Sequence, residues 1–80
     1  MEKQFRTSNI DFVAYLKTEE IDFVKTEKSK NNNKIMFSYD YNYDELIKIQ
    51  NDFINFKIYL NYTKFKEERN RILDVVKLYN

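Results

Sequence analysis

The sequence of 80 residues contains no cysteine, histidine, glycine, proline or tryptophan. Without cysteine and histidine, the chain can form no disulfide bond and no zinc site built from the usual ligands. The commonest general base and the strongest side-chain nucleophile of enzymes are missing as well. Without glycine, no loop can easily bring several backbone amides close to a phosphate group. We therefore expect a protein that is not an enzyme and has no cofactor.

The first residues and the hydropathy indicate where the protein resides. Residues 1–6 contain no apolar stretch typical of a signal peptide. No apolar run approaches the ~18 residues that a membrane span requires. The absence of cysteine also fits the reducing interior of a cell. These features predict a cytoplasmic protein without a membrane partner.

Lysine, asparagine, isoleucine, phenylalanine and tyrosine dominate the composition. Their codons are rich in A and T, so we expect a gene from an AT-rich genome, such as a low-GC bacterium or one of its mobile elements. The 14 basic and 13 acidic residues give a formal charge of +1. This balance argues against a uniformly basic nucleic-acid coat, and it leaves both protein and nucleic-acid partners open.

The beginning of the chain predicts a short strand followed by a helix. Residues Gln4–Thr7 can pair as an edge strand, and Ser8 with Asp11 three residues later matches the pattern of a helix N-cap. The helix is expected over residues 9–19. Its buried face would consist of side chains at helical spacing, namely Ile10, Val13, Ala14 and Leu16, broadened by Phe12 and Tyr15.

Two further runs, residues 21–28 and 34–39, alternate between apolar and polar side chains as strands do. Residues 29–33 between them contain three asparagines in a row. In a chain without glycine, asparagine is the residue best able to adopt a positive φ angle in a turn. We therefore predict a β-hairpin.

The second half of the chain predicts two helices. Asn42 and Glu45 match the capping pattern at the start of the first, which should end near Asn55. The second is expected over residues 61–78, after an apolar connector, residues 56–60. The side chains expected to face inward are Tyr43, Leu46, Ile47, Phe53 and Ile54 in the first helix, Ile58 and Leu60 in the connector, and Tyr62, Phe65, Ile72, Val76 and Tyr79 in the second.

Arg69 interrupts the apolar stripe of the last helix. It should either extend past the core into solvent or pair with a buried carboxylate. Glu67 and Arg71 are spaced for an ion pair within the same helix. Together the elements predict one small α+β domain over residues 1–80, in the order β-α-β-β-α-α, with a short antiparallel sheet packed against helices.

Tyrosines and acids alternate just before and at the start of the second helix. Exposed tyrosine is common at protein interfaces, and neighbouring acids would suit a basic partner. The candidate protein-interaction residues are Tyr39, Asp40, Tyr41, Asp44 and Glu45. Alternatively, the acids merely cap the helix, and Tyr39 and Tyr43 belong to the core. For these two tyrosines we favour the position in the core. Tyr41 is expected to point outward.

The same segment also matches the beginning of a calcium-binding loop. Asp40, Asn42 and Asp44 stand at its first, third and fifth positions. Glu45 then replaces the required glycine, and Asn51 replaces the bidentate glutamate. We therefore predict no metal site.

Lysines gather on the predicted hairpin. The candidate nucleic-acid contacts are Lys25, Lys28, Lys30, Asn32 and Lys34. The lysines could contact phosphates and the asparagine could reach base edges. A solvated turn whose lysines discourage pairing of an edge strand with other chains explains the same residues. We favour this second interpretation, because no arginine or aromatic residue joins the tract.

Several segments resemble a family of small uncharacterised domains from phages and bacteria. Phe5–Ser8 resembles its aromatic-x-Thr-Ser opening, Asn9–Leu16 its apolar alanine-containing helix, and Ile35–Asp40 its strand ending in an acid. Asp52–Asn55 and Tyr62–Phe65 are similar to its second helix end and last helix start. The chain lacks the glycine usual after the second helix and the paired alanine of the first. The resemblance implies the same fold and a mobile-element origin, and it supplies no site residues.

Three functions agree with these features. We favour a binding protein encoded by a phage or mobile element, which inhibits a host protein or a ribonucleoprotein defence complex by direct contact, as anti-CRISPR proteins do. The second is a nucleic-acid-binding or regulatory protein that uses the hairpin. The third is a structural subunit that self-associates through an apolar surface such as the connector, residues 56–60.

Overall fold

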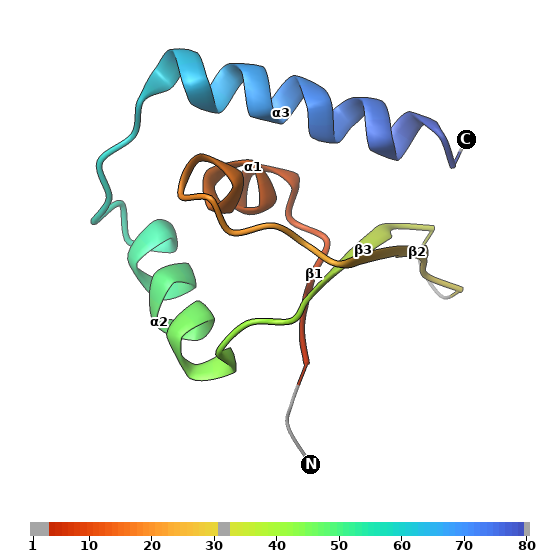
Figure 1. Cartoon of the computed structure of the whole chain (residues 1–80), viewed down its shortest axis with the longest axis horizontal. Coiled ribbons are helices and arrows are strands. Elements are labelled where there is room, and N and C mark those ends of the chain that lie inside the picture. Colours follow the sequence, from red (N-terminus) through yellow and green to blue (C-terminus); the bar gives the residue numbers. More distant parts are fainter. Residues whose placement is uncertain (1–3, 31–32, 80) are drawn as a thin grey trace.

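The computed structural model describes residues 4–30 and 33–79. Within these ranges, three strands and three helices follow one another in the expected order (Figure 1). The elements are β1 (Phe5–Thr7), α1 (Ile10–Thr18), β2 (Lys25–Lys28), β3 (Ile35–Tyr39), α2 (Tyr43–Ile54) and α3 (Tyr62–Lys77). The prediction of an α+β fold with the order β-α-β-β-α-α is therefore confirmed.

The three strands form an antiparallel sheet in the order β1-β3-β2. β3 is central because Phe5 of β1 pairs with its Tyr39 and Thr26 of β2 pairs with its Phe37. Directly paired residues place their side chains on the same face of a sheet. Ile35, Phe37 and Tyr39 are buried, as their alternation predicts, and this face of the sheet packs on the helices.

α1 lies in the middle of the fold, with α3 along one side and the sheet and α2 on other sides (Figure 1). Residues 12–16 are all buried, which requires cover from several directions. The Phe12 ring lies 5.9 Å from that of Phe5 in β1 and 5.4 Å from that of Phe53 in α2. α1 therefore joins the sheet and the other helices into one core.

α2 and α3 contribute few fully buried side chains. Leu46 is the buried residue of α2, and Ile72 and Glu68 are those of α3. Other residues expected on the inner faces pack against the core and are partly buried: Tyr43, Ile47, Phe53, Ile58, Phe65, Val76 and Tyr79. In the described part of the chain, no helix is long and apolar enough to cross a membrane.

Each helix begins after an asparagine. The Asn9 side chain accepts a hydrogen bond of 3.1 Å from the third residue after it, so the prediction of Ser8 as the N-cap is wrong. The Thr7 hydroxyl accepts the N–H of Asn9 at 3.1 Å and helps to hold Asn9 at the cap position. Asn42, as predicted, and Asn61 cap α2 and α3 in the same way.

β2 begins at Lys25, four residues later than predicted. The N–H of Ile21 donates to the carbonyl of Leu16 at 2.9 Å and so completes the C-terminal cap of α1. The chain is therefore still turning at Ile21 and is not yet part of the sheet. Ile21 and Phe23 nevertheless pack against the core, as expected of apolar residues in this segment.

The charged residues of α3 pair differently from the prediction. Arg69 Nε donates to Asp11 Oδ1 of α1 at 2.6 Å. Asp11 is exposed, so of the two alternatives predicted for Arg69 the buried carboxylate partner is wrong, and the side chain instead extends past the core to a carboxylate at the surface. Arg71 Nη1 binds Glu68 Oε1 at 2.5 Å, and the expected Glu67 partner is replaced because Glu68, one residue later, is the carboxylate within reach.

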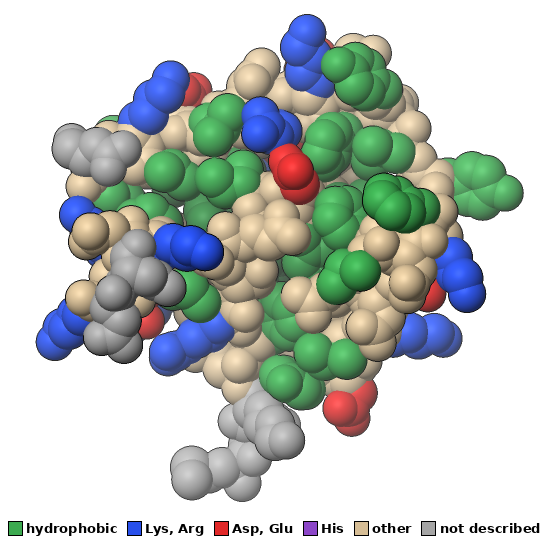
Figure 2. Space-filling view, turned by 180° about the vertical axis from the view of Figure 1, so that it is seen from behind, with side chains coloured by type: hydrophobic (Ala, Val, Ile, Leu, Met, Phe, Trp, Pro, Cys, Tyr) green, Lys and Arg blue, Asp and Glu red, His purple; other side chains and the backbone are tan. Residues whose placement is uncertain are grey.

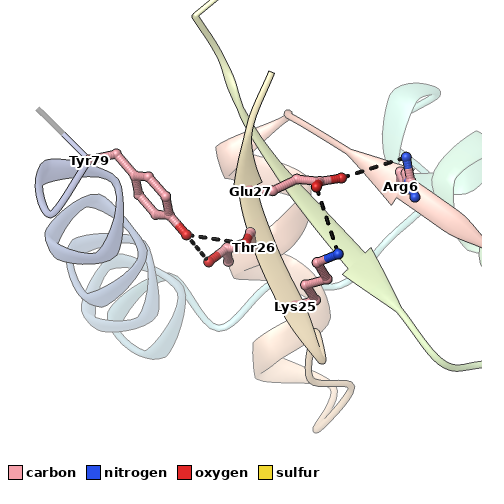
Figure 3. Close-up of polar contacts among 5 residues, drawn as sticks. All are labelled: Arg6, Lys25, Thr26, Glu27 and Tyr79. Carbon is pink, nitrogen blue, oxygen red and sulfur yellow. Dashed lines mark hydrogen bonds and ion pairs between the residues drawn. The ribbon is translucent and has the colours of Figure 1, made fainter. Parts of the chain in front are cut away.

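The end of α3 is tied to β2 by a tyrosine hydroxyl. The Tyr79 hydroxyl lies 2.6 Å from the Thr26 hydroxyl and donates to the Thr26 carbonyl at 3.1 Å (Figure 3). We expect Tyr79→Phe to lower the free energy of unfolding by about 1 kcal/mol, because these bonds are lost while the ring remains. Urea denaturation of Tyr79→Phe, Thr26→Val and the double variant measures the coupling. Strictly additive losses would contradict the contact.

The hydroxyl of Tyr39 is buried and has no hydrogen-bond partner among the described residues. Burial, and secondarily the negative charge of Asp22, raise the pKa of Tyr39 above its ordinary value. The unfolded chain therefore loses this proton first, so stability should fall as the pH rises above about 10.

We expect Tyr39→Phe to raise the free energy of unfolding by about 1 kcal/mol at neutral pH, because an unsatisfied polar group is removed. The same substitution should make the alkaline loss of stability shallower. Urea denaturation at neutral pH and at about pH 11 tests both effects. A variant that is less stable than the wild type, or equally sensitive to alkali, would contradict this account.

Candidate interaction surface

The segment of tyrosines and acids connects β3 to the first turn of α2. Tyr39 belongs to the core, with 1% of its surface exposed, so it is not accessible to a partner. Tyr41 points outward as predicted, with 44% exposed. Asp40, Asp44 and Glu45 are also exposed. Asp44 and Glu45 lie in the first turn of α2, where the helix dipole stabilises acids without any partner.

The lysines of the hairpin are exposed but spread out. Lys25 and Lys28 stand at the two ends of β2, Lys30 follows in the turn, and Lys34 precedes β3. Asn33 has a φ angle of 56°, which confirms an asparagine in the left-handed conformation in this turn. The candidate contact Asn32 lies outside the described residues.

A carboxylate neutralises part of the positive charge beside the hairpin. Glu27 lies 3.6 Å from the guanidinium of Arg6 and 3.7 Å from the amine of Lys25 (Figure 3). Arg6 and Lys25 come together because both pair with Ser38 of the central strand. The sequence does not indicate that Arg6 lies here, because the order of the strands cannot be derived from a short edge strand. A phosphate would have to compete with Glu27 for both cations.

Large apolar side chains are exposed around the connector between α2 and α3. We call this set the connector surface: Ile54, Phe56, Tyr59, Leu60 and Tyr62, with 57%, 89%, 99%, 41% and 69% of their surfaces exposed. The predictions that Ile54, Leu60 and Tyr62 face inward are wrong. In Figure 2, which shows the molecule from behind, hydrophobic side chains protrude at the edge where, by its place in Figure 1, the connector lies.

Phe56 adopts a backbone conformation that is unusual for its type. Its φ angle is 59°, in the left-handed region that bulky residues avoid. The N–H of Phe56 donates to the Phe53 carbonyl at 3.2 Å, and that of Lys57 donates to the Asp52 carbonyl at 2.8 Å. These two bonds define a Schellman motif, in which the position of Phe56 is usually glycine.

The end of α1 provides a comparison within the same chain. Glu20 also has a positive φ, 62°, and the same two bonds run from Glu20 to Lys17 and from Ile21 to Leu16. At the end of α1, Ile21 packs against the core after the turn. At the end of α2, the strained residue itself is an aromatic ring left in solvent. Phe56 thus costs conformational energy and contributes little burial to the fold.

A pocket adjoins the connector surface. Its volume is about 250 Å³. It is lined by Tyr15 of α1 and the C-cap residue Glu19, by Ile49 and Asp52 of α2, and by Lys57, Ile58 and Tyr59 of the connector. The sequence does not predict this pocket, because its walls come from three separate segments. The one local indication of a binding surface is the apolar connector itself, which contains Phe56, Tyr59 and Leu60 and no glycine.

The electrostatics of the pocket are set by its two carboxylates. Burial, followed by the negative charge of Glu19, a hydrogen bond to the Glu19 side chain and the negative charge of Asp52, raises the pKa of Tyr15. Among the described residues, neither Glu19 nor Asp52 forms an ion pair. Lys57 adds one positive charge to the lining. Two carboxylates without ion-pair partners among the described residues therefore line the pocket at the edge of the connector surface.

The described residues offer surfaces suited to binding. Within residues 4–30 and 33–79, no group of three or more carboxylates is placed to hold a metal ion. Asn42, part of the calcium-like segment, uses its side chain to cap α2. What the chain presents is an exposed apolar surface, a small acidic pocket and a separate basic hairpin.

Comparison with known proteins places the chain in a family. No curated protein and no solved structure matches it. One family model matches residues 2–78, nearly the whole chain, and its description is "Domain of unknown function (DUF5659)". This confirms the predicted resemblance to a family of uncharacterised domains, and the chain belongs to the DUF5659 family.

Proposed function

We propose that this domain acts by binding another protein through the connector surface. Phe56 carries the proposal: an aromatic side chain held in a strained backbone conformation and 89% exposed. Strained backbone is characteristic of functional sites, and aromatic residues dominate the energetics of protein interfaces. Tyr59, which is 99% exposed, and Leu60 extend the same apolar surface.

The biological role that we propose is inhibition by direct contact. The partner would be a host protein or defence complex, such as a CRISPR complex, and the domain would be carried by a phage or another mobile element. The small size, the abundance of residues whose codons are rich in A and T, and the absence of histidine and cysteine support this role. Tyr41 with Asp40, Asp44 and Glu45 would form a second, weaker contact area on the same partner.

Nucleic-acid binding by the hairpin is the second candidate. Arg6 favours it, because the sheet brings this arginine onto the face that carries Lys25. Glu27 weakens it, since this carboxylate contacts both cations. The connector surface is thus the better candidate.

Capture from a lysate of a low-GC bacterium tests the proposal. A tagged wild type is compared with three variants, Phe56→Gly, Lys28→Glu with Lys30→Glu, and Tyr41→Ala with Asp40→Ala, each with and without nuclease. We expect the wild type to capture one defined protein that is retained after nuclease treatment. Among the three variants, Phe56→Gly should show the largest loss of this protein. Loss of the partner on nuclease treatment, or only with the lysine substitutions, would contradict the proposal and indicate that the hairpin is the binding site.

A further inference from the structure

The pocket beside the connector surface has a volume suited to one side chain. Its volume of about 250 Å³ lies below the roughly 300–1,000 Å³ typical of small-molecule sites. Tyr59 belongs both to the pocket wall and to the connector surface. A partner segment that covers Phe56 and Tyr59 would therefore also reach the pocket.

The lining favours a positively charged occupant. Glu19 and Asp52 supply two carboxylates without ion-pair partners among the described residues, and two tyrosines, Tyr15 and Tyr59, also line the pocket. Guanidinium and ammonium groups form charge-assisted hydrogen bonds with carboxylates and favourable contacts with aromatic faces. Lys57 offsets only one of the two negative charges. An acidic or neutral polar side chain would gain neither interaction.

We propose that the partner inserts an arginine or lysine side chain into the pocket formed by Tyr15, Glu19, Asp52 and Tyr59, while apolar residues next to it cover Phe56. This inference rests on the proposed function, because it specifies the chemistry of the protein segment that the connector surface binds. It also gives the surface a means of selection: apolar contacts supply affinity, and the carboxylates select a basic segment.

The test is selection from a random peptide library displayed on phage. The targets are the wild type, Glu19→Gln with Asp52→Asn, and Phe56→Gly. A matched control, Glu67→Gln with Asp74→Asn, removes the same charge from exposed positions on α3, far along the chain from the pocket. The best selected peptide is then resynthesised with citrulline in place of arginine, or norleucine in place of lysine, and titrated against the wild type.

We expect peptides selected on the wild type and on the control to contain a basic residue flanked by apolar residues. The variant Glu19→Gln with Asp52→Asn should bind these peptides at least about tenfold more weakly than the wild type does. The wild type should bind the neutral form of the peptide more weakly by a similar factor. Peptides that depend on Phe56 but show no basic preference would overturn the inference and leave the proposed function intact. If no selected peptide depends on Phe56, or if the protein instead self-associates through this surface, both proposals are wrong.

Discussion

Replacing Phe56 with glycine should make the domain more stable and at the same time deprive it of its partner. The left-handed conformation costs an L-residue roughly 1–2 kcal/mol, and glycine adopts it without this cost. Phe56 is 89% exposed, so little burial is lost with its side chain. After subtraction of the entropy that glycine loses on folding, we expect a gain of about 1 kcal/mol, or roughly 4–8 °C in Tm.

The same substitution should weaken partner binding by about 30-fold or more, the effect of losing a central aromatic contact. Glu20→Gly is the matched control, because Glu20 occupies the equivalent position of the α1 cap, with a φ of 62°. It should stabilise the domain similarly and leave binding unchanged. Thermal unfolding and partner titration of the two variants measure both quantities. Loss of stability in Phe56→Gly, or equal binding by both variants, would contradict our account of the connector.

Leu46→Ala should be the most destabilising of the substitutions considered. Leu46 is completely buried and is the residue by which α2 enters the core. Truncation of a buried leucine costs about 2–5 kcal/mol, and domains of this size have about 4–12 kcal/mol in total. We expect α2 to detach at low denaturant, and the connector surface and its pocket to lose their arrangement with it.

Ile54→Ala provides the control for Leu46→Ala. It removes a side chain from the same helix, but from a position with 57% exposure. Its effect on the free energy of unfolding should remain within about 0.5 kcal/mol, as for most surface substitutions. Urea denaturation followed by circular dichroism compares the two variants. Equal midpoints for both would show that α2 is not anchored through Leu46.

Local sequence signals predicted much of the fold. Alternation in residues 35–39 predicted the buried face of β3, and Asn42 predicted the start of α2. Both signals act within a few residues of the chain, where backbone geometry fixes which side chains share a face. Alternation in residues 21–28 predicted that β2 begins too early. Ile21 still donates a hydrogen bond to the C-terminal cap of α1, and the sheet begins after it.

The candidate site was less predictable than the fold. Hydrophobicity and spacing predict that Leu60 and Tyr62 face inward, but 41% of the surface of Leu60 and 69% of that of Tyr62 are exposed. Glu19 and Asp52 line the same pocket because α1 packs against α2, and no periodicity in the sequence encodes that packing. The sequence does not indicate the special conformation of Phe56, because its φ angle of 59° is a property of the folded backbone.

Photo-crosslinking from defined positions tests the central claim most directly. A photoreactive phenylalanine analogue replaces Tyr59, Tyr41 or Lys30, which report on the connector surface, the start of α2 and the hairpin. After irradiation in nuclease-treated lysate, our account predicts a protein adduct that forms predominantly from position 59. An excess of wild-type protein without the photoreactive residue should reduce the amount of this adduct. The same excess of Phe56→Gly should not reduce it. Adducts formed mainly from position 30 or 41, or only with a second copy of the domain, would contradict the claim that the connector surface binds a partner protein.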